Sequence, residues 1–374
     1  MSFLFGLVVL IAGCQTVSNG DSAGLTAAAT SLNNPAGSAN SDENWGNGAS
    51  TIALLIGDDS ATSGFDRLAF RQGANLAVSD LGSEVLSVHV FGHNNEDNSS
   101  FSQISSLNPK LIVRTATAKN DSLSSSTISA PVIALNSSDY STSAKDFAFL
   151  PAESESLAAG INFAAKDKKQ PVVLITPPGF SQKTLTNLKA RLPSKQELVT
   201  LAYTDAESAE RIAGRIVKKG PFAGIFAFAG NDPKAAAIAA ALTKTKSKQS
   251  NRTYVGNSNW DSALISKTAL NGAIIATLDT TNQSLMADRY QAKYGSPPSP
   301  SALHGYDLIA MASGIIRTSG PDSLNRSALL SDTGFTGTAG SFRLRSNGTV
   351  ERNLAIATIK NGALVQSQAP AQGF

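Results

Sequence analysis

Cysteine is almost absent from this sequence of 374 residues, which contains a single one at position 14. One cysteine cannot form an internal disulfide or a cysteine-based zinc site, so neither stabilises the fold. The chain also has little excess charge of either sign, because 31 Lys and Arg residues nearly balance 28 Asp and Glu residues. The net charge of +3 is far from the basic excess of nucleic-acid-binding domains, and we expect no nucleic-acid partner.

Residues that enzymes commonly use are few and scattered. The chain has three histidines, at positions 89, 93 and 304. The first two fall at a predicted strand end and in the loop after it, where solvated side chains are more common than metal ligands. Residues 179–181 (Gly-Phe-Ser) lack the second glycine of a nucleophile elbow, and no glycine-rich phosphate loop is present. We therefore expect a protein that is not an enzyme and holds neither a metal nor a cofactor.

Long apolar runs are missing as well. The run Phe3–Ala12 is far too short to cross a membrane. Its end overlaps Ile11-Ala12-Gly13-Cys14, which resembles the lipobox of bacterial lipoproteins, whose cysteine becomes the lipidated mature N-terminus. The resemblance implies a signal peptide over residues 1–13 and membrane attachment through the lipid on Cys14 alone. No Lys or Arg precedes the run, and an ordinary signal peptide with an incidental cysteine is the alternative.

Residues 14–50 are rich in Ser, Ala, Asn and Gly. Such a composition buries too little apolar surface to order itself, so we expect a lipidated flexible tether. Gln15 follows the cysteine. By the sorting rule of bacterial lipoproteins, Asp at this place retains the protein at the inner membrane. Gln15 therefore predicts a periplasmic protein anchored to the outer membrane.

From residue 51 onward, short apolar strands alternate with amphipathic helices. Several strands lack polar alternation, which is typical of strands covered on both faces. The alternation predicts an α/β protein with parallel sheets wrapped by helices, and the number of strands favours two sheets. The predicted strands are 52–56, 85–91, 111–113, 132–135, 172–175, 198–202, 224–228, 253–256 and 273–277.

The C-terminal part has a different pattern. Two apolar runs, 340–344 and 354–360, are separated by Arg-Ser-Asn-Gly at 345–348. Asn-Gly between apolar runs is a strong hairpin signal, so the chain is predicted to end in antiparallel structure.

Three segments in this order resemble the type I periplasmic binding proteins, the Leu/Ile/Val-binding family. The first is strand 52–56 with Ser63-Gly64-Phe65 and the helix through residues 71–74. The second is 290–308, with Tyr294-Gly295 and His304-Gly305-Tyr306-Asp307-Leu308. The third is 335–348, with Phe335, Gly337, Gly340, Phe342 and Asn347-Gly348. The resemblance covers about residues 51–362.

The resemblance implies two lobes, each a parallel sheet wrapped by helices, joined by three hinge crossovers. Lobe 1 is expected at about 51–148 and 279–332, and lobe 2 at about 149–278 and 333–374. A ligand is expected in the cleft between the lobes, at the carboxyl ends of the strands.

Small hydroxyl residues follow two lobe-1 strands: Thr115 and Thr117 after one, and Ser137 and Ser138 after the next. Hydroxyls and free N–H groups at strand ends suit a ligand carboxylate or carbonyl, and the family uses such residues at these places. The alternative is that they are ordinary turn residues.

Four further positions complete the expected ligand-binding set. Phe65 matches the aromatic residue that the family places over the ligand, and Phe180 matches a second one from lobe 2. Asn231 follows strand 224–228 at the lobe-2 edge of the cleft. Ser258 belongs to residues 257–259, near the place where amino-acid binders of this family carry an acidic residue for the ligand's ammonium group.

That last position is neutral here, since residues 257–259 read Asn-Ser-Asn. A buried ammonium without a carboxylate is costly. Arg114 also replaces a usual glycine, which leaves amino-acid specificity open. Two functions are therefore carried forward. One is a lipoprotein that binds a small polar, amino-acid-like ligand for an ABC permease. The other is an outer-membrane lipoprotein that regulates a peptidoglycan synthase, similar to the activators of penicillin-binding proteins.

Overall fold

The computed structural model describes residues 43–57, 65–93, 99–115, 128–137, 139, 146–166, 170–220, 223–245, 251–370 and 374. All of them belong to one unit, Asn40–Phe374. The predicted signal peptide, Cys14 and the tether up to residue 42 lie outside the described residues. Within the described part, no helix has the length and apolar character needed to cross a membrane.

The first lobe is built on a six-stranded sheet in the order β1-β3-β2-β4-β5-β6. All neighbours are parallel except β1, which runs antiparallel to β3 at the edge. The strands are β1 Glu43–Trp45, β2 Ser50–Gly57, β3 Leu86–His93, β4 Leu111–Thr115, β5 Val132–Ser137 and β6 Asp146–Leu150. Residues 43–50, expected in the tether, are therefore part of this lobe, and the buried Trp45 explains why they are ordered.

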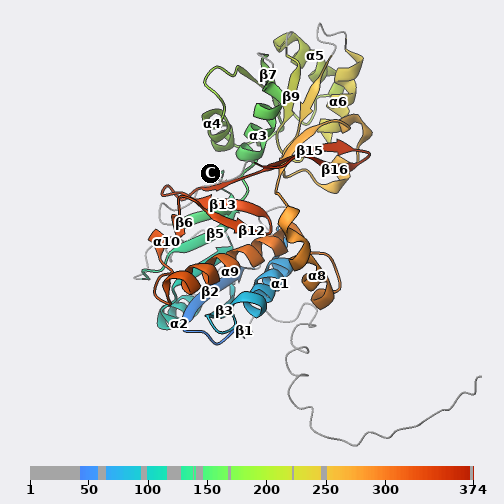
Figure 1. Cartoon of the computed structure of the whole chain (residues 1–374). Coiled ribbons are helices and arrows are strands. Elements are labelled where there is room, and N and C mark those ends of the chain that lie inside the picture. Colours follow the sequence, from blue (N-terminus) through green and yellow to red (C-terminus); the bar gives the residue numbers. More distant parts are fainter. Residues whose placement is uncertain are drawn as a thin grey trace, which may run out of the picture. The chain divides into compact units, whose positions relative to one another are not determined.

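Helices cover both faces of this sheet, as Figure 1 shows. Ile52, Leu54 and Ile56 of β2 pack under α1 Arg67–Ala77 and α9 Pro300–Ser319, whereas Ala53 and Leu55 face α2 Ser99–Leu107. This two-sided burial is why the strand sequence has no polar alternation. Two further helices, α8 Ser284–Tyr294 and α10 Arg326–Leu329, belong to the same lobe.

Two glycines let α1 and α9 pack closely. A Cβ at Gly73 would lie 1.9 Å from the carbonyl oxygen of Ala302, and one at Gly305 would lie 2.1 Å from that of Phe70. Both contacts involve backbone, which cannot move aside cheaply. The close approach fixes the N-terminal turns of α9 against α1.

The second lobe is built on a seven-stranded sheet in the order β16-β15-β11-β10-β9-β7-β8. Strands β7 to β11 are parallel, and β15 and β16 add an antiparallel edge beside β11. The strands are β7 Val172–Thr176, β8 Leu198–Ala202, β9 Ile225–Phe228, β10 Thr253–Val255, β11 Ile274–Thr277, β15 Ala355–Lys360 and β16 Ala363–Gln368.

Helices α3 Glu153–Ala165 and α4 Gln182–Arg191 pack on one face of this sheet, against Val172 and Leu174. Helices α5 Ala209–Lys219 and α6 Lys234–Lys244 pack on the other face, with the short α7 Ser262–Ile265 nearby. The predicted two-lobed α/β fold is confirmed, with the addition that each sheet carries antiparallel strands at its edge.

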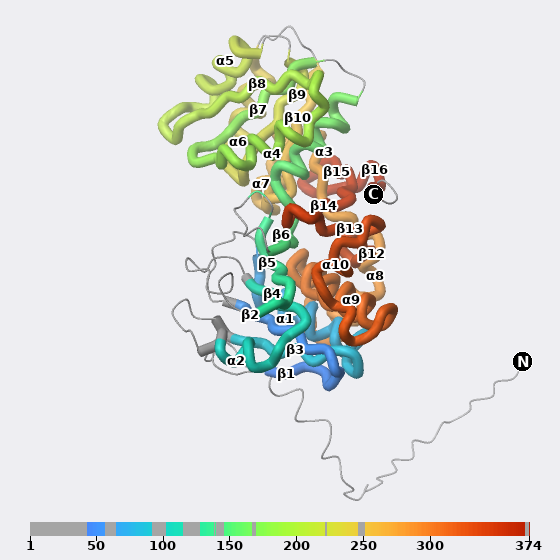
Figure 2. The backbone as a smooth tube through the Cα atoms, turned by 90° about the vertical axis from the view of Figure 1, so that its left-hand side faces the viewer, coloured from blue at the N-terminus to red at the C-terminus, as the bar shows by residue number. Residues whose placement is uncertain are grey.

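The chain passes between the lobes three times, after β6, after β11 and after β14 (Figure 2). The small sheet of β12 Phe335–Gly337, β13 Gly340–Leu344 and β14 Val350–Arg352 precedes the last passage. Its residues Phe342, Leu344 and Val350 pack in the core of the first lobe. This placement differs from the expected start of lobe 2 at residue 333, because three apolar side chains of this sheet complete the lobe-1 core.

The Asn-Gly turn at 347–348 does form a hairpin, but between β13 and β14 rather than with residues 354–360. Those residues instead form β15, which joins the second sheet and pairs with β16 across a second Asn-Gly turn at 361–362. The antiparallel C-terminal structure is thus confirmed with different strand partners.

Candidate ligand-binding site

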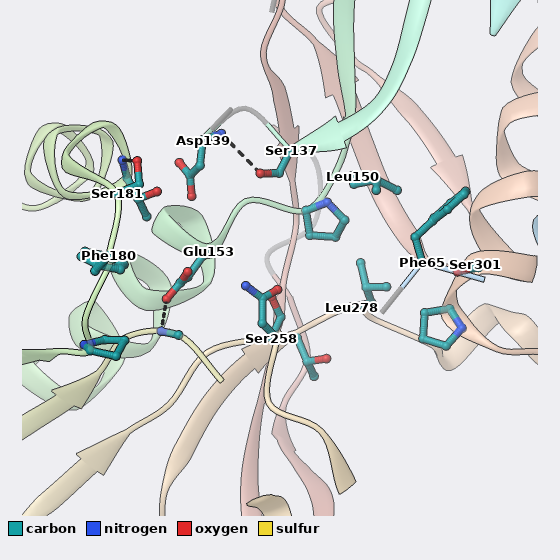
Figure 3. Close-up of a pocket in the computed structure, with 18 of the residues that line it drawn as sticks. Phe65, Ser137, Asp139, Leu150, Glu153, Phe180, Ser181, Ser258, Leu278 and Ser301 are labelled. Atoms are coloured by element: carbon teal, nitrogen blue, oxygen red, sulfur yellow. Dashed lines mark hydrogen bonds between the residues drawn. The ribbon is translucent and has the colours of Figure 1, made fainter. Parts of the chain in front are cut away.

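A cavity of about 480 Å³ lies between the lobes and is lined from both of them. Figure 3 shows Asp139, Glu153, Phe180 and Ser181 on one side, and Phe65, Leu278 and Ser301 on the other. The lining residues are Phe65, Ser137, Asp139, Leu150, Pro151, Glu153, Pro177, Pro178, Gly179, Phe180, Ser181, Thr184, Gly230, Ser258, Asn259, Thr277, Leu278, Pro300, Ser301 and His304.

The lobe-2 wall begins with the turn 177–179 (Pro-Pro-Gly) after β7. Gly179 adopts a φ of +75°, a conformation that favours glycine, and this turn carries the chain to Phe180. Ser181 caps α4 by accepting a hydrogen bond from the Thr184 N–H at 3.3 Å. The cap fixes the start of α4 and, with it, the half-buried Phe180 beside the cavity.

The lobe-1 wall is formed by Phe65 and the start of α9. The Phe65 ring packs against Phe70 of α1 with centroids 5.5 Å apart. The Ser301 hydroxyl accepts a hydrogen bond from the Asp66 N–H at 2.9 Å, which ties the segment before α1 to α9. Ser137, at the end of β5, lines the same cavity.

Glu153 is the first residue of α3, directly after the first passage between the lobes. Its Oε1 accepts a hydrogen bond from the Gly230 N–H in the loop after β9 (Figure 3). Burial raises the pKa of the Glu153 carboxyl to about 7; the Gly230 N–H opposes this rise and the nearby Asp139 adds to it. The group therefore changes charge near neutral pH.

Asp139 is a second carboxylate in the lining, and it is buried. It comes from the lobe-1 segment after β5 but bonds to lobe 2. Its oxygens accept from the Ser154 N–H at 2.8 Å, the Ser154 hydroxyl at 2.6 Å and the Asn187 side-chain amide at 3.0 Å. Asp139 thus links the two lobes next to Glu153.

His304 of α9 lines the cavity and is only 4% exposed. Burial, with the nearby Arg352 acting in the same direction, holds the pKa of the His304 imidazole well below its usual value, so the ring is neutral. Its Nδ1 has no hydrogen-bond partner among the described residues. His304 therefore has unused hydrogen-bonding capacity beside the cavity.

Residues 257–259, near the place where the family binds the ammonium group of its ligand, are held by hydrogen bonds within the second lobe and its loops. The Asn257 side-chain amide donates to the carbonyl oxygens of Phe228 at 3.1 Å and Gly230 at 2.9 Å. The Ser258 N–H donates to the Ser156 hydroxyl at 2.9 Å, while the Ser258 hydroxyl oxygen is buried without a partner in the described part of the chain.

The structure brings four of the predicted ligand-binding residues to the cavity: Phe65, Ser137, Phe180 and Ser258. Asn231 is not part of the described lining, and its side chain instead exchanges hydrogen bonds with Asp261.

Thr115 is the last residue of β4, whereas Thr117, Ser138 and the lipidation site Cys14 lie outside the described residues. Arg114, noted as unusual for the family, forms an ion pair with the buried Asp146 of β6.

Sequence reasoning missed Asp139, Glu153, Ser181, Ser301 and His304 as cavity residues. Ser181 and Ser301 are polar residues at helix starts, a recognisable signal. Glu153 also begins a helix, but its burial beside the cavity, like that of His304, depends on contacts between segments distant in sequence. Among the described residues, no group of three or more His, Cys, Asp or Glu side chains is arranged to hold a metal ion.

Three solved structures illustrate what the fold resembles. A putative branched-chain amino acid ABC transporter protein from Rhodospirillum rubrum matches with a TM-score of 0.68 and 15% identity, covering 85% of this chain and 99% of that one. A solute-binding protein of an R. palustris ABC transporter, in complex with benzoate, matches with a TM-score of 0.58 and 16% identity. The match covers 87% of this chain and 98% of that one.

The C-domain of LpoA from Haemophilus influenzae, a regulator of PBP1A, gives a TM-score of 0.63 and 14% identity, covering 85% of this chain and 99% of that one. At these identities the likeness shows the fold alone. A search of curated protein sequences gave no significant match. The family model described as "Periplasmic binding protein" matches residues 104–363, and the chain belongs to that family.

Proposed function

We propose that this protein is a non-catalytic binding protein that captures a small polar ligand between its lobes for an ABC importer. The cavity of about 480 Å³, lined by residues of both lobes, is the observation that carries the proposal. Its volume lies in the range of small-molecule sites, and it combines apolar walls with a few polar groups, as such sites do.

The division of the lining between lobes suits capture by closure. Phe65 and Ser301 come from lobe 1, and Phe180 and Ser258 come from lobe 2. A ligand that contacts both walls binds the closed arrangement better than the open one, and closure is favoured by that difference in affinity. Several structural neighbours are binding proteins of ABC transporters, which supports the same role.

Native mass spectrometry of the protein purified without refolding tests this function. We expect a small molecule to co-purify and to rebind, by calorimetric titration, to protein from which it was removed. Protein that carries no ligand and binds none from a periplasmic metabolite extract would contradict the proposal.

Regulation of a peptidoglycan synthase is the second candidate. Two observations favour it: residues 257–259, near the family's ammonium position, are neutral and are held by structural hydrogen bonds, and the LpoA C-domain shares the fold. Capture of a penicillin-binding protein by ligand-free protein, with stimulation of its glycan-polymerising activity, would favour this role over transport.

Both roles place the protein in the periplasm, and we propose that it is lipid-anchored at Cys14 to the outer membrane. The lipobox-like sequence and Gln15 support this location. An importer component and an envelope regulator would differ in their partner, so the capture experiment separates them without depending on the anchor.

A further inference from the structure

The cavity has an uneven charge that the balanced composition of the chain does not predict. Its described lining contains the two carboxyl groups of Asp139 and Glu153 but no Lys or Arg. The chain as a whole has a net charge of +3. The described lining is therefore acidic although the protein as a whole is slightly basic.

The two carboxyl groups are not equally available. Asp139 accepts three hydrogen bonds, from two Ser154 groups and the Asn187 amide, and is committed to joining the lobes. Glu153 accepts one hydrogen bond from the Gly230 N–H, through Oε1. Among the described residues, none donates to its Oε2, so Glu153 retains the capacity to bind a donor from a ligand.

His304 gives a second, independent indication of a ligand. Its side chain is 4% exposed and lines the cavity from α9 of the opposite lobe, with Nδ1 unpartnered in the described part of the chain. A buried imidazole normally has a partner at each nitrogen, and a neutral ring accepts at one of them. The unpartnered Nδ1 of His304 accepts or donates according to the tautomer of the ring, so His304 offers a ligand one polar contact.

We propose that the cavity selects a small organic amine without a free carboxylate, with its ammonium group bound to Glu153 and its apolar body between Phe65 and Phe180. This inference rests on the proposed ligand-binding function and specifies the class of ligand. It assigns the binding of the ligand's ammonium group to Glu153 at the start of α3, whereas the resemblance to the family places that site near residues 257–259.

The exclusion of a free carboxylate follows from the charges. A carboxylate ligand would lie near Asp139 and Glu153 without a cationic side chain from the described lining to balance it. Like charges in a partly desolvated site repel, whereas an ammonium group is attracted by both carboxylates. The hydrophobic walls formed by Leu150, Leu278 and the two phenylalanines suit the body of such an amine.

Binding of the amine should depend on pH. Asp139 is the charged group that acts on Glu153 from lobe 1; Gly230 faces it from the loop after β9, and His304, from α9, stays neutral. Because the pKa of Glu153 is about 7, its charged fraction rises between pH 6 and pH 8. Alkylammonium ions, like lysine, keep their proton in this range, so affinity should increase about tenfold.

Two pairs of ligands with the same body and opposite charge provide the test: benzylamine with benzoate, and 3-methylbutylamine with 3-methylbutanoate. Calorimetric titration at pH 8 should show binding of the amines and none of the carboxylates. Equal or tighter binding of the carboxylates would overturn the inference while leaving ligand binding intact. Failure of all four to bind at millimolar concentration would also overturn the inference, whereas the proposed function is contradicted only when the protein binds nothing from the metabolite extract.

Glu153→Gln keeps an acceptor for the Gly230 N–H but removes the charge. It should lower amine affinity about tenfold or more, as loss of a charged hydrogen bond does, and abolish the pH dependence. Glu210→Gln makes the same change at an exposed site of the same lobe and should leave amine affinity unchanged.

Unchanged affinity in folded Glu153→Gln would overturn the assignment. If that variant does not fold, the pH profile of the parent protein decides instead, and a flat profile would overturn it.

Discussion

Replacement of Arg352 by Met should destabilise the protein, because this buried arginine acts electrostatically on two buried acids, Asp307 and Glu155. Arg352 ends β14 and is 5% exposed. Its Nη2 donates to the carbonyl oxygen of Phe149 at 2.6 Å, and its guanidinium lies 5.0 Å from the Phe149 ring centroid and 5.1 Å from that of Phe342. The buried Asp307 and Glu155 act on it with opposite charge, and Glu155 also forms an ion pair with Arg191 at 3.7 Å.

The magnitude follows from the kind of contact that is lost. Removing one partner from a buried charged group costs about 3–5 kcal/mol, because the other charge remains buried. The lower end applies here, since Nε and Nη1 of Arg352 have no partner among the described residues and their burial already has a cost. With an unfolding entropy of about 2.1 cal/mol/K per residue, a loss of about 3 kcal/mol lowers the Tm of the unit 40–374 by about 4 °C.

The penalty should also increase with pH. Burial raises the pKa of both the Glu155 and the Asp307 carboxyl, and the positive charge of Arg352 limits each rise. The pKa of each carboxyl is higher in the folded than in the unfolded protein, where it is 4.5 for Glu155 and 3.8 for Asp307. The fold is therefore most stable below these unfolded values, and it loses stability as pH rises from the unfolded pKa through the folded pKa. Without Arg352 both pKa values rise further, so the variant loses more stability at pH 8 than at pH 5.

Thermal unfolding followed by circular dichroism at the two pH values measures this effect. Arg345→Met is the matched control, because Arg345 is 38% exposed in its side chain and pairs with the partly exposed Glu351. The Arg345→Met variant should lose no more than about 1 kcal/mol of its free energy of unfolding. An Arg352→Met penalty that equals the control, or that shrinks from pH 5 to pH 8, would refute the role of Arg352 as the counter-charge of the two acids.

Other changes test the remaining parts of the structure. Trp45→Ala should cost about 3–5 kcal/mol in chemical denaturation, as large core truncations do; parent-like stability would mean that β1 does not pack on the first lobe. Phe180→Ala should weaken ligand binding about fivefold in calorimetry with little change in Tm, since this half-buried ring lines the cavity; unaltered affinity would place the ligand elsewhere. Glu153→Gln should remove a loss of stability between pH 4.5 and about 7, because a raised acid pKa destabilises the fold as pH rises through it; a pH profile of Tm like that of the parent would argue against the titration of Glu153. Cys14→Ser should move the protein to the soluble periplasmic fraction, since acyl chains provide the anchor; unchanged membrane fractionation would refute the lipobox interpretation.

The strands and helices of both sheets could be predicted largely from local patterns. All nine strands predicted between residues 52 and 277 correspond to observed strands, and helices lie between them as expected. Apolar runs and turn residues lie next to one another in sequence, so they can be read without the tertiary structure. Strands β1, β6, β12, β14 and β16 were not predicted; β1, β12 and β14 have only three residues each, whereas β6 and β16 have five and six.

The aromatic walls of the cavity were predictable, but its charge was not. Phe65 and Phe180 were identified from their places after particular strands, which the resemblance to a known family supplied. Glu153 looks in sequence like an ordinary acid in the first turn of a helix. Its contact with Gly230, 77 positions away, forms only when the second lobe folds, and its proximity to Asp139 arises only when the two lobes meet.

The sequence by itself determined the alternation of strands and helices, the antiparallel C-terminus and the lack of cysteine-based stabilisation, because each depends on composition or on neighbours a few residues apart. The tertiary structure alone decided that β12–β14 complete the first lobe and that Asp139, Glu153 and His304 share one cavity. Burial and charge at those positions are properties of segments that are far apart in the chain, and they exist only after the lobes have packed.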